Sequence, residues 1–200
     1  MSNSQRPACR GTQQFLWCAV VLCMCFLATP AATAAPEGMS VEVRSASLVL
    51  DQDVYELDAR IELELPEEAR EAIEAGLTMR LEYLIEVRRV RDFMPDASVA
   101  ELAQKFELSY HALSQRYLVR KLNTGEQQDY GTLQAALDRI SDVHGLPVID
   151  AALVGPDRPY EVGIRAVVDL NTGSDALRWI LFWTDDWSVE SEWYEWPLRP

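Results

Sequence analysis

The histidines are the first candidates for chemistry, because imidazole is the side chain that titrates close to neutral pH. The chain has two, His111 and His144. A hydrolytic histidine works beside a positioned nucleophile and an orienting carboxylate, and no spacing in this sequence indicates such a triad. We therefore assign no catalytic residue. We expect His111 to be hydrogen-bonded beside a strand bend, with a hydrolase centred on it as the alternative, and His144 to lie at the end of a helix.

A cluster of arginines is the second candidate. Arg88, Arg89 and Arg91 crowd together at the end of a long alternating run in an otherwise acidic chain. Arg89 and Arg91 fall on the apolar parity of that run, so the strand either leaves the core there or carries them at its rim. We predict that these three arginines, together with His111, form a surface that binds a protein partner.

Two arginines of the same run have a simpler explanation. Arg80 and Arg88 share the outward parity of the strand. Opposite charges on adjacent strands pair across the sheet surface. We expect these two side chains to pair with Glu62 or Glu64 on a neighbouring strand.

The tryptophans offer an alternative binding site. Five of the six lie in the closing segment from Arg178 to Trp196. Aromatic side chains line grooves for sugars and peptides, so Trp179 and Trp183 are the candidate platform of a small-molecule or glycan-binding protein. For Trp187 and Trp193 we expect inward packing in the core.

The sequence contains no pattern that would hold a metal or a phosphate cofactor. Its two histidines are more than thirty residues apart, which does not fit a zinc site. The aspartate pairs Asp51/Asp53 and Asp185/Asp186 lack the spacing of a calcium loop and are expected in turns. The glycines are isolated rather than grouped in a phosphate-binding loop. We predict neither a metal nor a cofactor.

The first 34 residues have the three parts of a secretory signal peptide. Arg6 and Arg10 are basic, residues 15–28 are apolar, and Ala32–Ala34 has the small residues of a cleavage site. The apolar run is shorter than the ~20 residues that span a membrane, although an uncleaved anchor is the alternative. At the end of the apolar run no small residue precedes a cysteine, as a lipoprotein would require: Leu22 precedes Cys23 and Met24 precedes Cys25. All four cysteines lie in this segment: Cys9, Cys18, Cys23 and Cys25.

The remaining chain is therefore free of cysteine and strongly acidic. Only two of the 18 basic residues and none of the 32 acidic ones precede Ala35, so the rest carries a net charge of −16. Such a surface argues against binding nucleic acid or anionic lipid without specificity. We predict a bacterial periplasmic protein with no membrane span after cleavage.

The hydrophobic pattern after the signal peptide is mainly that of strands. Leu81, Tyr83, Ile85 and Val87 share one parity of the longest alternation, which predicts a central strand. Residues 97–105 fit a helix or a strand. We expect a bulge near Arg44 in the first strand. The expected strands are 41–50, 54–65, 77–93, one from Phe106, 116–122, 160–170 and 187–196, and the expected helices are 66–75 and 130–144.

About seven strands and two helices without a regular strand–helix repeat favour antiparallel pairing. We predict a mainly β fold, an immunoglobulin-like antiparallel β-sandwich with two short helices. The alternative is an α+β fold with both helices on one face of the sheet. Residues 35–40 would be a linker, and residues 41–200 a single β-rich domain.

The segment Tyr110–Ser114, YHALS, followed by Tyr117, resembles a signature of the exported proteobacterial family called domain of unknown function 4390. The similarity extends from about residue 41 to the end of the chain, except at 171–177, where NTGSDAL stands in place of an expected proline-containing run. Further matching positions are Arg88-Arg89, Thr132-Leu133, Ala136-Leu137, Leu170, Trp187, Ser191 and Trp193.

The resemblance implies an exported protein without an assigned reaction, and an association with membrane sensor kinases of the nitrogen-regulation type. Together with the arginine cluster, it favours a periplasmic, non-enzymatic protein-interaction module.

Overall fold

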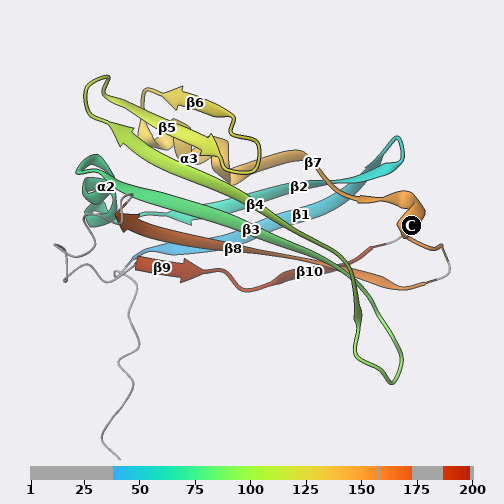
Figure 1. Ribbon diagram of the computed structural model, residues 1–200. Coiled ribbons are helices and arrows are strands. Elements are labelled where there is room, and N and C mark those ends of the chain that lie inside the picture. Colours follow the sequence, from blue (N-terminus) through green and yellow to red (C-terminus); the bar gives the residue numbers. More distant parts are fainter. Residues whose placement is uncertain (1–37, 157, 173–186, 199–200) are drawn as a thin grey trace, which may run out of the picture. The chain divides into compact units, whose positions relative to one another are not determined.

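The computed structural model describes residues 38–156, 158–172 and 187–198. The described chain is mainly β, with two antiparallel sheets packed together and two short helices, which confirms the predicted sandwich-like class (Figure 1). An immunoglobulin-like strand order stays a prediction. The expected signal peptide, residues 1–34, lies outside the described residues.

The smaller sheet has three strands in the order β1-β2-β7. β1 (Ser40–Asp51) and β2 (Val54–Glu64) form an antiparallel hairpin, and β7 (Asp142–Asp150) pairs with the other edge of β2. The register of the hairpin shifts between Val43 and Ser45, which confirms the predicted bulge. A short 3-10 turn, Ala151–Leu153, follows β7.

The larger sheet has the order β10-β8-β3-β4-β5-β6, with β9 also paired to β8. Its centre is the strand predicted from alternation, whose inward side chains are almost fully buried. Residues 97–105, which fitted either structure, are strand. The strands are β3 (Leu77–Arg89), β4 (Ala97–His111), β5 (Arg116–Lys121), β6 (Gln127–Tyr130), β8 (Tyr160–Thr172), β9 (Trp187–Glu190) and β10 (Tyr194–Leu198).

Each helix carries the chain from one sheet to the other. α2 (Glu67–Glu74) joins β2 to β3, and α3 (Leu133–Ser141) joins β6 to β7. α2 follows Pro66 and ends before Gly76, whose φ of 109° is a left-handed conformation that glycine adopts without strain. Because Ala69 and Ile73 of α2 are fully buried, the helix closes the core at that end.

The main core lies between the sheets and includes the buried face of α3. Tyr83 at the centre of β3 is fully buried and donates a hydrogen bond to the backbone carbonyl of Ile140 in α3. Burial raises the pKa of Tyr83 far above its ordinary value. A smaller apolar cluster containing Tyr55, Val87 and Tyr160 forms a second core.

The prediction of a helix over 130–144 is wrong at both ends. Thr132 begins α3 because its side chain accepts a hydrogen bond of 3.2 Å from the Ala135 amide. From Asp142 the backbone is extended, and Val143 pairs with Ala59 of β2. The hydrogen-bonding groups of a distant strand end this helix, and the apolar spacing alone does not reveal them. His144 therefore lies in β7 rather than at a helix end.

The prediction of one strand over 187–196 is also corrected. Ser191 separates β9 from β10, since its amide donates to the Ala166 carbonyl at 2.9 Å and its hydroxyl accepts from the Ala166 amide at 3.0 Å. Trp187 packs partly on the core as expected. Trp193 does not point inward: its ring covers Gly163 on the outer face of β8, where an added Cβ would lie 3.1 Å from the indole.

Candidate functional site

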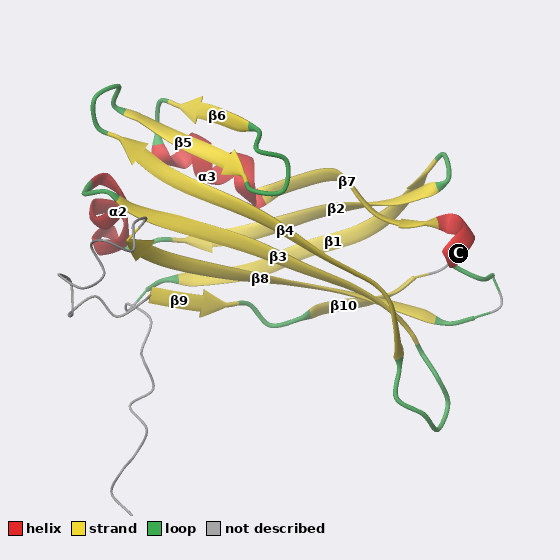
Figure 2. Ribbon diagram, viewed as in Figure 1, coloured by secondary structure: helices red, strands yellow, loops and turns green. Residues whose placement is uncertain are grey.

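The loop between β3 and β4, residues 90–96, lies at the end of the larger sheet (Figure 2). It carries apolar side chains that are exposed to solvent. Phe93 is fully exposed, Met94 is 61% exposed and Val90 is 36% exposed. Phe93 also has a φ of 64°, which is uncommon for a bulky residue. Exposed apolar side chains gathered at one point are typical of a contact surface.

The base of this loop is held by hydrogen bonds. The Val90 amide donates to the Pro159 carbonyl at 3.0 Å, which ties the loop to the segment before β8. The Arg91 amide donates to the Asp96 carboxylate at 3.1 Å, which closes the loop on itself. The exposed side chains are therefore presented by an anchored turn.

Arg88 is occupied within the sheet rather than available to a partner. It forms ion pairs with Glu195 of β10 and, at 3.8 Å, with Glu161 of β8. Burial lowers the pKa of Arg88, but the hydrogen bond and charge of Glu195 outweigh it and the pKa is raised.

The expected pairing of the outward arginines with Glu62 or Glu64 is wrong. Arg80 lies 3.7 Å from Glu107 of β4, while Glu62 pairs with Arg44 of β1. The reason is that β2 belongs to the smaller sheet, whereas β3 has its strand neighbours in the larger one.

Arg89 and Arg91 are the two cations of the predicted surface that remain at the exposed loop. Both side chains are half-buried, and over residues 38–156, 158–172 and 187–198 neither guanidinium group has a carboxylate within 4 Å. The Nε of Arg91 is buried and has no hydrogen-bond acceptor in the same ranges. We name the group of Arg89, Val90, Arg91, Phe93 and Met94 the hairpin tip.

His111 does not join the hairpin tip. It ends β4, whereas the tip precedes the start of that strand. Arg88 pairs with Ser98, and β4 runs from there to His111, so at about 3.3 Å per residue the histidine lies roughly 40 Å along the sheet. The four residues predicted as one surface therefore belong to two separate places.

At its own place His111 is hydrogen-bonded in an exposed turn. Its Nδ1 lies 2.9 Å from the hydroxyl of Ser114. Gln115, which follows Ser114, has a positive φ of 52°. This confirms the expected histidine beside a strand bend. The hydrogen bond between His111 and Ser114 was not predicted from the sequence, although their separation of three residues is that of a turn contact.

The surface next to His111 is a shallow hollow of about 340 Å³. Its wall includes the ion pair between Arg116 and Asp129. A general base of the serine-hydrolase kind also needs a carboxylate on its second ring nitrogen, and in the described chain no hydrogen bond is found at Nε2 of His111.

His144 lies between two carboxylates on the smaller sheet. Its Nε2 is 3.1 Å from Asp142 and its Nδ1 is 3.4 Å from Asp58. The hydrogen bond with Asp142 and the negative charge of Asp142 raise the pKa of His144, and the hydrogen bond and charge of Asp58 raise it further. Asp58 also accepts a hydrogen bond of 3.0 Å from the Gly145 amide.

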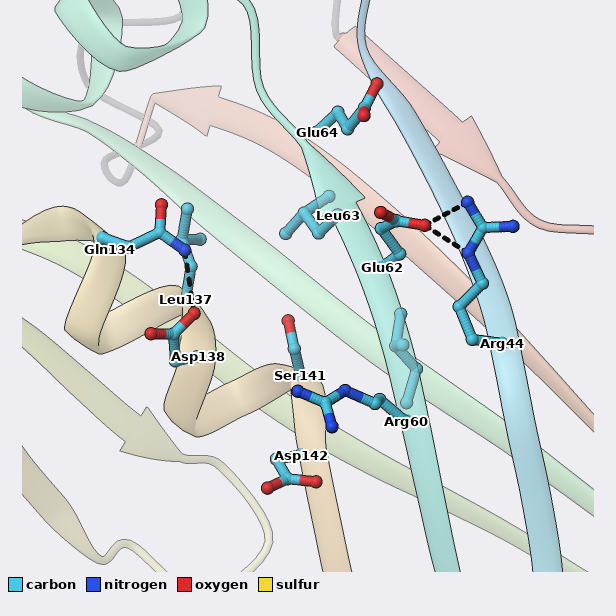
Figure 3. Close-up of a pocket in the computed structure, with 11 residues that line it drawn as sticks. Arg44, Arg60, Glu62, Leu63, Glu64, Gln134, Leu137, Asp138, Ser141 and Asp142 are labelled. Atoms are coloured by element: carbon cyan, nitrogen blue, oxygen red, sulfur yellow. Dashed lines mark hydrogen bonds and ion pairs between the residues drawn. The ribbon is translucent and has the colours of Figure 1, made fainter.

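A larger hollow of about 600 Å³ lies between β2 and α3 (Figure 3). We name it the β2 groove. Sequence reasoning did not find it, because its two walls are about seventy residues apart in the chain. It is lined by Arg44, Arg60, Ile61, Glu62, Leu63, Glu64, Gln134, Leu137, Asp138, Ser141 and Asp142.

The remaining predictions concern the tryptophan platform, metal binding and a membrane span. Trp179 and Trp183, the alternative ligand platform, lie outside the described residues. Among the residues that are described, no three His, Cys, Asp or Glu side chains are grouped as metal ligands would be. The described helices are all too short or too polar to cross a membrane.

Comparison with known families shows that the chain matches a family model over most of its length. The model of the family described as Domain of unknown function (DUF4390) matches residues 39–197. Comparison with the curated proteins and with the solved structures gives no match.

Proposed function

The chain belongs to the DUF4390 family, and we propose that it is a periplasmic, non-enzymatic interaction module that docks on a protein partner through its hairpin tip. The observation that carries the proposal is the exposure of Phe93 and Met94 on an anchored loop. The signal-peptide pattern of residues 1–34 supports the periplasmic address.

The proposed contact would derive its free energy from apolar burial. Transfer of a Phe or Met side chain from water to a packed interface stabilises by about 1.5–3 kcal/mol each. Few residues dominate most protein interfaces, and aromatic side chains that fill a pocket are prominent among them. Phe93 would be the central anchor, with Met94 beside it.

The two arginines define the chemistry of the partner. Arg89 and Arg91 flank Val90 at the base of the loop and have no ion-pair partner in the described chain. A partner with an apolar pocket and an acidic rim would bury Phe93 and provide carboxylates for these guanidinium groups. We propose the outer part of a membrane sensor kinase as this partner, on the strength of the family resemblance.

Photo-cross-linking in the native compartment tests the proposal. A photoreactive phenylalanine analogue replaces Phe93 in one variant and Leu113 in a matched control, because Leu113 is 94% exposed in the turn after β4. We expect a protein adduct of defined mass from position 93 and none from position 113. The Arg89→Glu/Arg91→Glu background should abolish that adduct.

Two results would refute the docking proposal: equal cross-linking from positions 93 and 113, or an adduct at position 93 that the arginine reversals leave unchanged. Identification of the adduct by mass spectrometry then decides whether the partner is a membrane kinase.

A further inference from the structure

The strand β2 has an open edge over its last four residues. β7 pairs with β2 from Val54 to Arg60, and its first residue, Asp142, lies opposite Arg60. Residues 61–64 still pair with β1 on the other side. In the part of the chain that the structure describes, no strand pairs with residues 61–64 on the α3 side.

The backbone groups that face this edge can be identified. The Asp53 carbonyl points to the β7 side, since it accepts a hydrogen bond of 2.8 Å from the Ala151 amide. Alternate residues of a strand direct their amide and carbonyl groups to the same side. The irregularities in the pairing of β2 with β1 and with β7 place the extra residues on β1 and β7. The alternation along β2 is therefore uninterrupted. Ile61 and Leu63 therefore direct their N–H and C=O groups into the open edge.

The open edge faces the β2 groove, whose opposite wall is α3 (Figure 3). Ile61 is buried in the core and Leu63 is partly buried against it. Both residues also contribute to the lining of the groove. Four residues of strand extend roughly 13 Å. A short extended segment could therefore fit in the groove and form hydrogen bonds with the free backbone N–H and C=O groups of β2.

The groove walls carry more acidic than basic side chains: Glu62, Glu64, Asp138 and Asp142 against Arg44 and Arg60. Glu64 lies on β2 and Asp138 lies on α3, and neither has a cation within 4 Å in the described ranges. Asp138 accepts a hydrogen bond of 2.8 Å from Gln134. Arg44 is already engaged by Glu62. A basic side chain on the bound segment would be placed between uncompensated carboxylates.

We propose that the β2 groove binds an extended, lysine- or arginine-bearing segment of a partner protein, which adds as a strand to the edge at Ile61–Glu64. Main-chain hydrogen bonds to Ile61 and Leu63 supply the affinity, and Glu64 and Asp138 select the basic side chains. This contact is separate from the hairpin tip, and neither requires the other.

A defined peptide tests the inference on the purified full chain. The probe is acetyl-Thr-Lys-Val-Arg-Val-Thr-amide, titrated while amide hydrogen exchange is followed residue by residue. We expect saturable binding and slower exchange of the Ile61 and Leu63 amides. The same peptide methylated on alternate backbone nitrogens should not bind, because it cannot form the strand ladder.

Charge reversal distinguishes binding in the groove from attraction of the peptide to the overall negative charge of the chain. Glu64→Lys/Asp138→Lys should weaken binding of the probe at least tenfold. Glu71→Lys/Glu101→Lys makes the same change in net charge at exposed positions away from the groove and should leave binding unchanged. Phe93→Ser should also leave it unchanged, which keeps this result independent of the hairpin tip.

Three results would overturn the inference: no binding, equal loss in both charge-reversed variants, or binding without protection of Ile61 and Leu63. Protection that rises with protein concentration in the absence of peptide would assign the edge to a second copy of the chain, and would also overturn it.

Discussion

The hydroxyl of Tyr83 donates a hydrogen bond to the backbone carbonyl of Ile140. This contact joins the central strand of the larger sheet to the last turn of α3, across 57 residues of sequence. The same turn of α3 leads directly into β7, so the contact helps to set where β7 begins and where the edge of β2 becomes open.

Tyr83→Phe is expected to lower the free energy of unfolding by about 1–3 kcal/mol, because it leaves a buried carbonyl without its donor. Urea unfolding followed by circular dichroism measures the change. Tyr110→Phe is the control: Tyr110 packs its ring on Tyr117, with centroids 4.9 Å apart, and the substitution keeps that ring. A control that loses as much stability as Tyr83→Phe would show that the hydrogen bond is not the cause.

The charge on His144 makes stability depend on pH. Asp142 and Asp58 raise the pKa of His144 in the folded chain above its ordinary value. Its favourable contribution is therefore complete below the unfolded pKa of about 6.5 and is lost as the pH rises through the folded value. We expect His144→Gln to destabilise the chain more at about pH 5.5 than at about pH 8.5.

Denaturant unfolding at the two pH values checks this expectation. In the Asp58→Asn/Asp142→Asn background the same His144→Gln substitution should lose its pH dependence. A larger effect of His144→Gln at the higher pH would contradict the assigned ion pairs.

A substitution at Gly163 tests the position of the Trp193 side chain. An added Cβ would lie 3.1 Å from the indole, so Gly163→Ala should displace Trp193 or strain the strand, at a cost of about 1–3 kcal/mol. The displacement would also disturb Arg165, whose guanidinium lies 5.2 Å from the centre of the Trp193 ring. The measurement is the free energy of unfolding in urea.

Gly131→Ala is the matched control for that substitution. Nothing lies within 4 Å of a Cβ added at Gly131, so its effect should stay within about 0.5 kcal/mol. Equal stability of the two variants would place Trp193 elsewhere.

Much of the fold follows from local patterns in the sequence. Alternation predicts β2, β3 and β8, because each has one face on the core. Pro66 and Gly76 mark the limits of α2, because each favours the backbone conformation found there. These features depend on residues that are close in the chain, so a single sequence is enough to find them.

The features that sequence reasoning missed depend on distant partners. β7 exists because Val143 and Asp142 meet β2, and Arg88 is neutralised by Glu195, which is 107 residues away. The grouping of Arg88 with His111 failed for a related reason. The two residues are 23 positions apart, but one precedes the β3–β4 turn and the other ends the long strand that follows it.

The hairpin tip can be altered without harm to the core, since Phe93 and Met94 are exposed. Phe93→Ser/Met94→Ser should change the free energy of unfolding by no more than about 0.5 kcal/mol per site. If the tip is the docking surface, the same variant should lose its partner. Leu113→Ser is the control, because it removes an equally exposed apolar side chain at the opposite end of β4.

The most direct test of the docking account is therefore the amount of partner complex that each variant forms in its native compartment. Gentle cross-linking followed by native electrophoresis of the tagged chain measures it. The account predicts a slower-migrating complex with the unaltered chain and with Leu113→Ser, and its loss with Phe93→Ser/Met94→Ser despite unchanged stability. A complex that persists undiminished in the Phe93→Ser/Met94→Ser variant would contradict it.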